Sequence, residues 1–295
     1  MPQRIFVVDN NSADNSVERI KEKFPHVEVL ELSENLGFAG GNNLAFERLG
    51  CVEWVALLNP DTIPETQWIE KVLQSMEKNP DIDVFSSKLV NASDPSMIDG
   101  AGDIYHVCGL SWRRHHGLKI GEDLKQDDPV FSPCAAAAVY RRSMIEMVGG
   151  FDENYFCYNE DVDLMFRLRH QGAKHLYVES SIVAHVSSGI TGKDSDFAIF
   201  YGHRNLVWTF VKNMPGMKFY WYLPQHILLN IFSIIYYLFK GRLLVILKSK
   251  ASAIMGLKRA FRQRRDIQQQ RKSKDGDIIA CMCKGFFRPY FSRFK

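Results

Sequence analysis

Acidic side chains stand at three points of this sequence where they could contact a ligand. Asp9 directly follows the apolar run 5–8, Asp61 follows the run 54–58, and Glu160 and Asp161 open a helical pattern. Carboxylates hold hard divalent cations and accept protons from hydroxyl groups, so these positions could serve metal binding or general base catalysis. Which of these they do depends on the elements that position them.

Alternating strand and helix patterns surround the first two acids. Strands are predicted at residues 5–8, 27–32, 54–58 and 83–89, with helices at 17–24 and from a capping box at 62–65 to about 78. A polar, glycine-rich loop is expected over 33–43, before a short helix. This alternation predicts an α/β fold with a mostly parallel sheet and helices on both faces. Because ligands bind beyond the carboxyl ends of such strands, Asp9 and Asp61 are expected to face one crevice.

The second half of the chain mixes loops, strands and helices. A small, apolar segment at 129–140 predicts a tightly packed strand, and a helix is predicted from about 159 to 171, before Gly172. Glu160, Asp161 and Asp163 would lie in its first turn, where acids also stabilise a helix through its dipole. The loop Arg113-Arg114-His115-His116 could contact a phosphate or an acceptor, but a solvated loop is the expectation.

Four short motifs occur in order along the chain. They are Val7-Val8-Asp9-Asn10-Asn11-Ser12, Asn35-Leu36-Gly37-Phe38-Ala39-Gly40-Gly41-Asn42-Asn43, Leu57-Leu58-Asn59-Pro60-Asp61, and Gly149-Gly150-Phe151-Asp152 followed by Asn159-Glu160-Asp161-Val162-Asp163. Together they resemble family-2 glycosyltransferases with the GT-A fold, particularly the rhamnosyltransferase-like branch that builds bacterial surface polysaccharides. The resemblance covers roughly residues 4–210. Each motif alone is weak, whereas four in this order are specific.

The resemblance implies roles for the matching residues. Asp161 would be the catalytic base, with Glu160 beside it, and Asp61 with His185 would hold Mg²⁺ or Mn²⁺ on the donor diphosphate. The residues implied in binding the nucleotide-diphosphate-sugar donor are Asp9, Asn11, Ser12, Asn35, Gly37, Gly41, Asn42, Asn59 and Asp61. A cation neutralises charge on the leaving diphosphate, and a carboxylate takes the proton of the attacking hydroxyl. One base and one metal imply a single displacement with inversion.

Each role has a simpler alternative. Asp9 could belong only to a turn with Asx hydrogen bonds, Asp61 could lie near a helix cap, and His185 could be a packed histidine. The segment Gly37–Gly41 matches neither the dinucleotide-binding nor the Walker A pattern, so its contact with phosphate rests on the resemblance.

Two departures from the family pattern affect the prediction. Asn59 stands where the family's metal motif has its first acid, which removes one negative charge and implies weaker or water-mediated metal binding. The family also begins with a further strand and helix that supply part of the nucleobase pocket, and this sequence starts at the second strand. We therefore expect either that the true start of the protein lies further upstream, or that the protein is truncated and inactive.

Charge is distributed unevenly along the chain. Residues 1–239 carry 21 basic and 31 acidic side chains, whereas residues 240–295 carry 16 basic and 3 acidic ones, and the net charge of the whole is +3. The six cysteines are scattered and form no disulfide pattern, and Cys281 and Cys283 have no second pair for zinc, so a reducing compartment is expected. No signal-peptide pattern opens the sequence.

The region 219–239 is apolar and long enough to cross a bilayer. The donor site and the basic tail are both expected on the cytoplasmic side of the membrane, and a single crossing would place them on opposite sides. An interfacial segment on an anionic membrane keeps both on the cytoplasmic side and is therefore favoured. The alternatives are a helical subdomain packed on the catalytic body and a solvated tail. Nucleic-acid binding by the basic region 258–274 lacks a motif and is not expected.

The sequence therefore predicts an inverting glycosyltransferase that builds bacterial cell-surface polysaccharide, with dTDP-rhamnose as a candidate donor and a glycan or lipid-linked acceptor. Three regions are expected: a glycosyltransferase domain at 1–210, a membrane-associated helical segment at 211–257 and a basic tail at 258–295. The expected location is the cytoplasmic face of the inner membrane, or the cytoplasm. The competing hypothesis is a glycosyltransferase-like module that binds without turnover.

Overall fold

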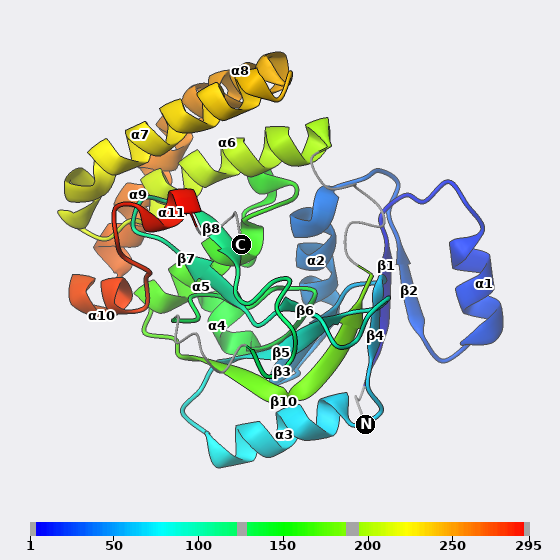
Figure 1. The fold of residues 1–295 in the computed structure, drawn as a ribbon. Helices are drawn as coiled ribbons and strands as arrows, with labels where there is room; N and C mark the ends of the chain where they lie inside the picture. The colour runs from blue at the N-terminus through cyan, green and yellow to red at the C-terminus, as the bar shows by residue number, and fades with distance from the viewer. Residues whose placement is uncertain (1–3, 123–128, 187–194, 292–295) are drawn as a thin grey trace.

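A mixed β-sheet forms the centre of the computed structural model, which describes residues 4–122, 129–186 and 195–291 (Figure 1). Its strands are β3 (Trp54–Leu58), β4 (Thr62–Pro64), β5 (Val84–Asn91), β6 (Ile98–Gly100), β9 (Ala137–Arg141) and β10 (His175–His185). They are hydrogen-bonded in the order β3, β9, β5, β10 and β4, with β6 paired to β5. β9 is antiparallel to both β3 and β5, and β10 is parallel to β5. β3, β5 and β10 therefore point the same way and end at one edge of the sheet.

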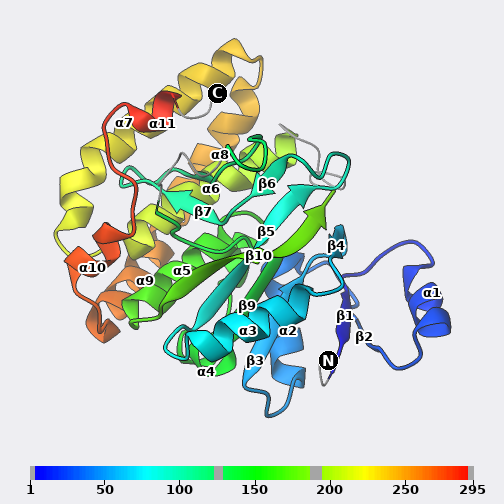
Figure 2. The ribbon, with the colours of Figure 1, turned by 60° about the horizontal axis from the view of Figure 1, so that its bottom comes forward.

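Helices cover both faces of this sheet (Figure 2). They are α2 (Gly37–Arg48), α3 (Trp68–Lys78), α4 (Arg142–Met147) and α5 (Glu160–His170). Successive strand residues point to opposite faces. In β9, Val139 packs with Val72 of α3, whereas Tyr140 packs with Ile145 of α4 and Leu164 of α5. The small side chains Ala137 and Ala138 allow this close approach from both sides.

Two small sheets lie outside the central one. β1 (Phe6–Asp9) and β2 (Glu28–Glu31) form a parallel pair, linked by α1 (Ser16–Lys23), at one side of the molecule (Figure 1). β7 (Asp103–Tyr105) and β8 (Ser111–Arg113) form an antiparallel pair in the loop-rich region. A short 3₁₀ helix, Glu153–Tyr155, precedes α5.

The C-terminal part of the chain is helical and packs on the sheet domain. It consists of α6 (Asp196–Asn213), α7 (Lys218–Phe239), α8 (Leu243–Met255), α9 (Leu257–Gln270), α10 (Asp275–Ala280) and α11 (Arg288–Phe291). α6 lies between the sheet domain and the pair α7 and α8, as Figure 1 shows. Phe210 of α6, Phe166 of α5, Phe219 of α7 and Ala260 of α9 belong to one buried cluster. The described part of the region after residue 257 is thus a set of helices rather than a solvated tail.

The structure corrects four details of the sequence prediction. The sheet is mixed rather than mostly parallel, because β9 inserts antiparallel between β3 and β5. Part of the expected loop 33–43 is helical, since α2 begins at Gly37. The capping-box segment at 62–65 forms β4 against β10, and α3 begins only at Trp68. The expected solvated loop 113–116 contains the end of β8 and the buried His115.

Candidate active site

The sheet edge at the end of β10 brings two predicted metal ligands together. β4 pairs antiparallel with β10, and the Val186 N–H donates to the Asp61 carbonyl at 2.9 Å. This pairing sets the Asp61 carboxylate 3.4 Å from Nε2 of His185. The other ring nitrogen of His185, Nδ1, lies 2.7 Å from the carboxylate of Asp99, a side chain with no solvent exposure. Asp99 thus fixes the orientation of the imidazole and keeps Nε2 on the side of Asp61.

A guanidinium group continues this chain of contacts. Arg113 bonds the Asp99 carboxylate and lies 3.3 Å from Nδ1 of His185. Its cross-strand partner is Asp103, because β7 and β8 pair Asp103 with Arg113. Burial alone would lower the pKa of Arg113, but the nearby acidic groups of Cys134, Asp99, Asp103 and Asp161 raise it above its usual range. Arg113 therefore holds a positive charge among several carboxylates.

The first turn of α5 carries the predicted base. Asp161 accepts hydrogen bonds from the Val162 N–H at 2.8 Å and the Ala135 N–H at 3.3 Å. Burial raises the pKa of Asp161, although those N–H groups and Arg113 oppose the rise. Burial, and then the charge of Asp161, raise the pKa of Glu160 well above its usual range. Both carboxyl groups therefore bind their protons more tightly than exposed ones do, and a charge on Asp161 disfavours a charge on Glu160.

Strained backbone leads into this helix. Phe156, Tyr158 and Asn159 all have positive φ angles, near 63°, 69° and 63°, which non-glycine residues rarely adopt. Asn205 of α6 holds the segment by donating to the carbonyls of Cys157 and Tyr158 at 2.8 Å each. Such strain persists only where surrounding contacts enforce it, and it is common at functional sites. The segment fixes where α5 begins and hence where Glu160 and Asp161 lie.

The start of α2, where part of the predicted donor-binding residues lie, contacts the strained segment 156–159. Asn10 accepts from the Leu36 N–H at 2.8 Å and donates to the Gly37 carbonyl at 2.9 Å, which joins the end of β1 to the start of α2. The Phe38 N–H donates to the Phe156 carbonyl at 2.8 Å. A Cβ at Gly37, where φ is +70°, would lie 2.4 Å from that carbonyl oxygen, so this close approach requires glycine.

The structure locates the remaining donor predictions without testing their role. The Asp9 carboxylate accepts from the Ser12 N–H at 3.1 Å, and Asn11 has a positive φ of 63° in the same turn. Asn35 accepts from the Gly37 N–H, and the Asn42 amide donates to the Phe38 carbonyl. Gly41 lies in α2, and the Asn59 N–H donates to the Ala136 carbonyl. Asp9 ends β1 of the small sheet, whereas Asp61 lies in the turn before β4 of the central one, so the shared crevice remains a prediction.

Two residues of the site, Asp99 and Asp103, were not predicted from the sequence, and Arg113 was expected to lie in a solvated loop. The signal was present in Asp99-Gly100-Ala101-Gly102-Asp103, where two acids flank small residues in a loop-rich region. No motif marks them, and only the pairing of β6 with β5 places Asp99 beside His185.

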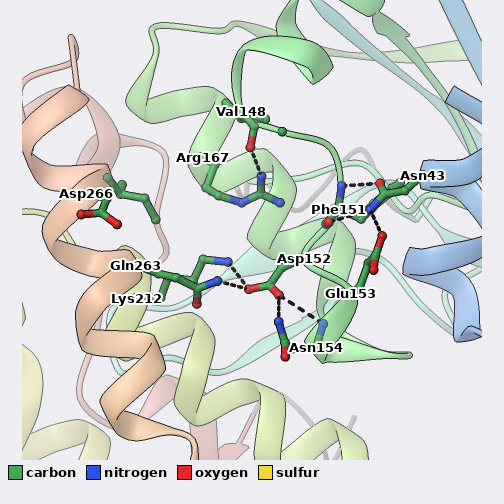
Figure 3. Close-up of a pocket in the computed structure, with 12 residues that line it drawn as sticks. Asn43, Val148, Phe151, Asp152, Glu153, Asn154, Arg167, Lys212, Gln263 and Asp266 are labelled. Carbon is green, nitrogen blue, oxygen red and sulfur yellow. Dashed lines mark hydrogen bonds and ion pairs between the residues drawn. The ribbon is translucent and has the colours of Figure 1, made fainter. Parts of the chain in front are cut away.

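A cavity of about 430 Å³ lies apart from these groups, between the segment 149–154, α5, α6 and α9 (Figure 3). Both basic side chains of its lining have acidic partners: Lys212 donates to Asp152 at 2.7 Å, and Arg167 donates to Asp163 at 2.8 Å and to the Val148 carbonyl. Figure 3 shows Gln263 of α9 bonded to the same Asp152 carboxylate. These contacts fix α5 against α6 and the segment before it. None of the predicted site residues lines this cavity.

Comparison with known proteins identifies the family. The model of glycosyl transferase family 2 matches residues 1–149, which is half of the chain. The chain belongs to glycosyl transferase family 2. A curated relative from Mycobacterium tuberculosis, named N-acetylglucosaminyl-diphospho-decaprenol L-rhamnosyltransferase, is 30% identical over 218 residues, which cover 65% of this chain and 69% of the relative. The predicted family membership is confirmed.

Further similarity supports the fold. A pre-mycofactocin glycosyltransferase from the same organism is 31% identical over 188 residues, 62% of this chain and 37% of that protein. The crystal structure of GalNAc-T7 with UDP, GalNAc and Mn²⁺ superposes with a TM-score of 0.53 at 15% identity, over 70% of this chain and 41% of that one. This family-2 glycosyltransferase therefore has the predicted GT-A-like α/β fold, followed by a C-terminal helical segment.

Proposed function

We propose that this family-2 glycosyltransferase moves a sugar from a nucleotide-diphosphate donor to an acceptor hydroxyl by a single inverting displacement. One observation carries the proposal: a series of contacts runs from Asp61 through His185 and Asp99 to Arg113, and the positive charge of Arg113 also acts on the buried carboxylate of Asp161. Asp61 and His185 could hold a metal ion and Asp161 could accept a proton, which are the two functions that such a transfer needs.

Asp161 is the proposed general base. Its raised pKa makes it a stronger proton acceptor than an ordinary aspartate, and its two backbone N–H contacts fix the carboxylate in place. Two buried neighbouring carboxyl groups do not both ionise readily, so a charge on Asp161 disfavours a charge on Glu160. Arg113 supplies a positive charge that favours the ionised form of Asp161.

Asp61 and His185 are the proposed protein ligands of a divalent cation. The residues fit this role, because a carboxylate oxygen and an imidazole Nε2 face each other and the carboxylate of Asp99 orients the ring. No set of three or more such ligands occurs among the described residues, so oxygens of the donor diphosphate would complete the coordination. Bound there, Mg²⁺ or Mn²⁺ would neutralise charge on the diphosphate leaving group.

We propose dTDP-rhamnose as the donor and a glycan or lipid-linked saccharide as the acceptor, in bacterial cell-surface polysaccharide synthesis. The support is the name of the mycobacterial relative, which pairs L-rhamnose with a decaprenyl-diphosphate-linked sugar. We also propose that transfer takes place at the cytoplasmic face of a membrane, where such an acceptor and a nucleotide-linked donor could meet.

The test uses purified protein, Mn²⁺ and a panel of nucleotide sugars, with a lipid-linked N-acetylglucosamine diphosphate as acceptor. We expect release of nucleoside diphosphate with one donor, and a product whose new linkage has the anomeric configuration opposite to that of the donor. A product with retained configuration would overturn the single displacement. Tight binding of a nucleotide sugar without transfer to any acceptor would instead favour the competing hypothesis of a module that binds without turnover.

A further inference from the structure

The outer surface of α7 and α8 carries an unusual number of exposed apolar side chains. At least two fifths of each side chain is solvent-exposed in the following residues: Tyr220, Trp221, Ile227, Leu228, Ile231, Phe232, Ile235, Leu238, Phe239, Leu244, Leu247, Ile254 and Met255. On α7 they recur every three or four residues, so they form one face of the helix. We call this set the α7–α8 face. Helices α7 and α8 lie on the far side of α6 from the sheet domain (Figure 1).

The opposite side of α7 is fixed to the protein along its whole length. Phe219 near the start contacts Phe210 of α6, with ring centroids 5.6 Å apart, and His226 stacks on Phe210 at 3.9 Å. His226 Nδ1 also lies 2.8 Å from the Cys108 carbonyl, and Tyr237 near the end packs against His203. α7 therefore lies flat on the body from its first turn to its last.

This packing argues against a membrane-crossing helix. Among the described helices, α7 alone is long and apolar enough to span a bilayer by length and composition. A spanning orientation would carry α6 and the polar groups that α7 buries, such as Asn230 bonded to Lys250 at 2.6 Å, into the lipid core. A helix that lies in the plane of the membrane exposes only its apolar face to lipid.

Basic residues predominate around the α7–α8 face. Between Asp196 and Asp266 the sequence contains no Asp or Glu but twelve Lys and Arg. Among the exposed ones, Lys240 and Lys248 lie at the turn between the helices and in α8, and Arg242 pairs with Asp196 at the start of α6. Anionic lipid head groups complement such a surface, whereas a symmetric second copy of the chain would oppose one positive surface with another. Trp221 and Tyr220, 77% and 62% exposed, are the residue types that concentrate at the membrane interface.

We propose that the α7–α8 face docks in the plane of an anionic bilayer, with α7 parallel to the surface. Its basic residues contact the head groups, and its apolar side chains enter the boundary with the acyl chains. α6 connects this surface to the site, because Asn205 of α6 holds the segment that precedes Glu160 and Asp161. The docking itself does not depend on the proposed reaction. Only its use, the presentation of a lipid-linked acceptor to Asp161, rests on the proposed function.

The experiment measures sedimentation of the full chain with vesicles of phosphatidylcholine alone or with phosphatidylglycerol added. We expect binding to the anionic vesicles that weakens as salt increases. The double variant Ile231→Asp with Ile235→Asp should lower the partition coefficient at least tenfold, and Lys240→Glu with Lys248→Glu should remove the preference for anionic lipid. Leu73→Asp on α3, exposed to 45% against 49% and 47% for the two isoleucines, is the matched control and should bind as the wild type does.

Several results would overturn the proposal. The α7–α8 face is not a membrane-docking surface if the wild-type protein does not bind anionic vesicles. The same conclusion follows if the Ile231→Asp/Ile235→Asp variant, shown to be folded by circular dichroism, binds them as the wild type does. Membrane-bound protein that resists extraction by alkaline carbonate indicates a spanning helix. A dimer in sedimentation velocity that the same variant dissociates, without vesicle binding, assigns the face to self-association. Because vesicle binding is measured without substrate, a protein that binds vesicles but transfers no sugar refutes the proposed function alone.

Discussion

Replacement of Asp99 by Asn tests how the metal ligands are positioned. Asp99 is fully buried, accepts from Nδ1 of His185 at 2.7 Å and bonds Arg113. A carboxylate in this position makes the imidazole a better ligand and holds its Nε2 toward Asp61. An amide of the same shape can still contact the ring, but it lacks the negative charge that strengthens the ligand.

Loss of such a supporting carboxylate typically weakens metal binding about 10- to 100-fold. In free energy this corresponds to about 1.4–2.8 kcal/mol, because each tenfold change is worth about 1.4 kcal/mol. We therefore expect Asp99→Asn to bind Mn²⁺ that much more weakly in the presence of a saturating nucleoside diphosphate. Isothermal titration calorimetry measures the affinity directly and does not require turnover.

The control is Asp94→Asn, at an exposed turn five residues away, where the carboxylate bonds Ser96. Thermal melting without metal shows whether Asp99→Asn still folds, since removing one partner of a buried ion pair can itself destabilise a protein. The reasoning is refuted if a folded Asp99→Asn protein binds Mn²⁺ as tightly as the wild type and the control do.

Three further predictions concern stability. Lys212→Met should lower the free energy of unfolding by about 3–5 kcal/mol in urea titrations, because it leaves the buried carboxylate of Asp163 without the ammonium group 2.9 Å away; an unchanged midpoint would contradict this. Burial lowers the pKa of Lys250 to about 7, so the unfolded state binds more protons between there and its ordinary value of 10.5. Stability should therefore rise with pH across that window, and Lys250→Met should remove this rise, as melting curves at several pH values would reveal. Gly37→Ala should destabilise by about 1–3 kcal/mol, because the positive φ and the Phe156 carbonyl leave no room for a Cβ; a variant that melts like the wild type would contradict it.

The sequence predicted Asp61, His185, Glu160 and Asp161 as site residues, and their roles stay predictions. The structure brings Asp61 and His185 together at the end of β10 and places Glu160 and Asp161 in the first turn of α5. Asp99 was not predicted, because a strand of three residues such as β6 is too short to show an alternation of apolar and polar residues. Its place beside His185 depends on pairing with a strand that ends eight residues earlier and on β10, more than seventy residues later.

The errors in the fold prediction have a similar cause. Local patterns predict β1, β2, β3 and β5, and their alternation with helices favours a mostly parallel sheet. β9 enters between β3 and β5 from a distant part of the sequence, and nothing in the segment 129–140 specifies its direction. For α7 the sequence showed an apolar helix, but only the contacts of His226 and Tyr237 show which of its faces is covered.

Single-turnover transfer by Asp161→Asn tests most directly whether Asp161 is the general base of the proposed reaction. With the donor that the panel identifies and the lipid-linked acceptor, we expect the transfer rate to fall about 10²- to 10⁴-fold, the range that a general base contributes, while donor affinity and melting temperature stay near those of the wild type. A folded Asp161→Asn protein that binds donor and transfers sugar at the wild-type rate would contradict the account.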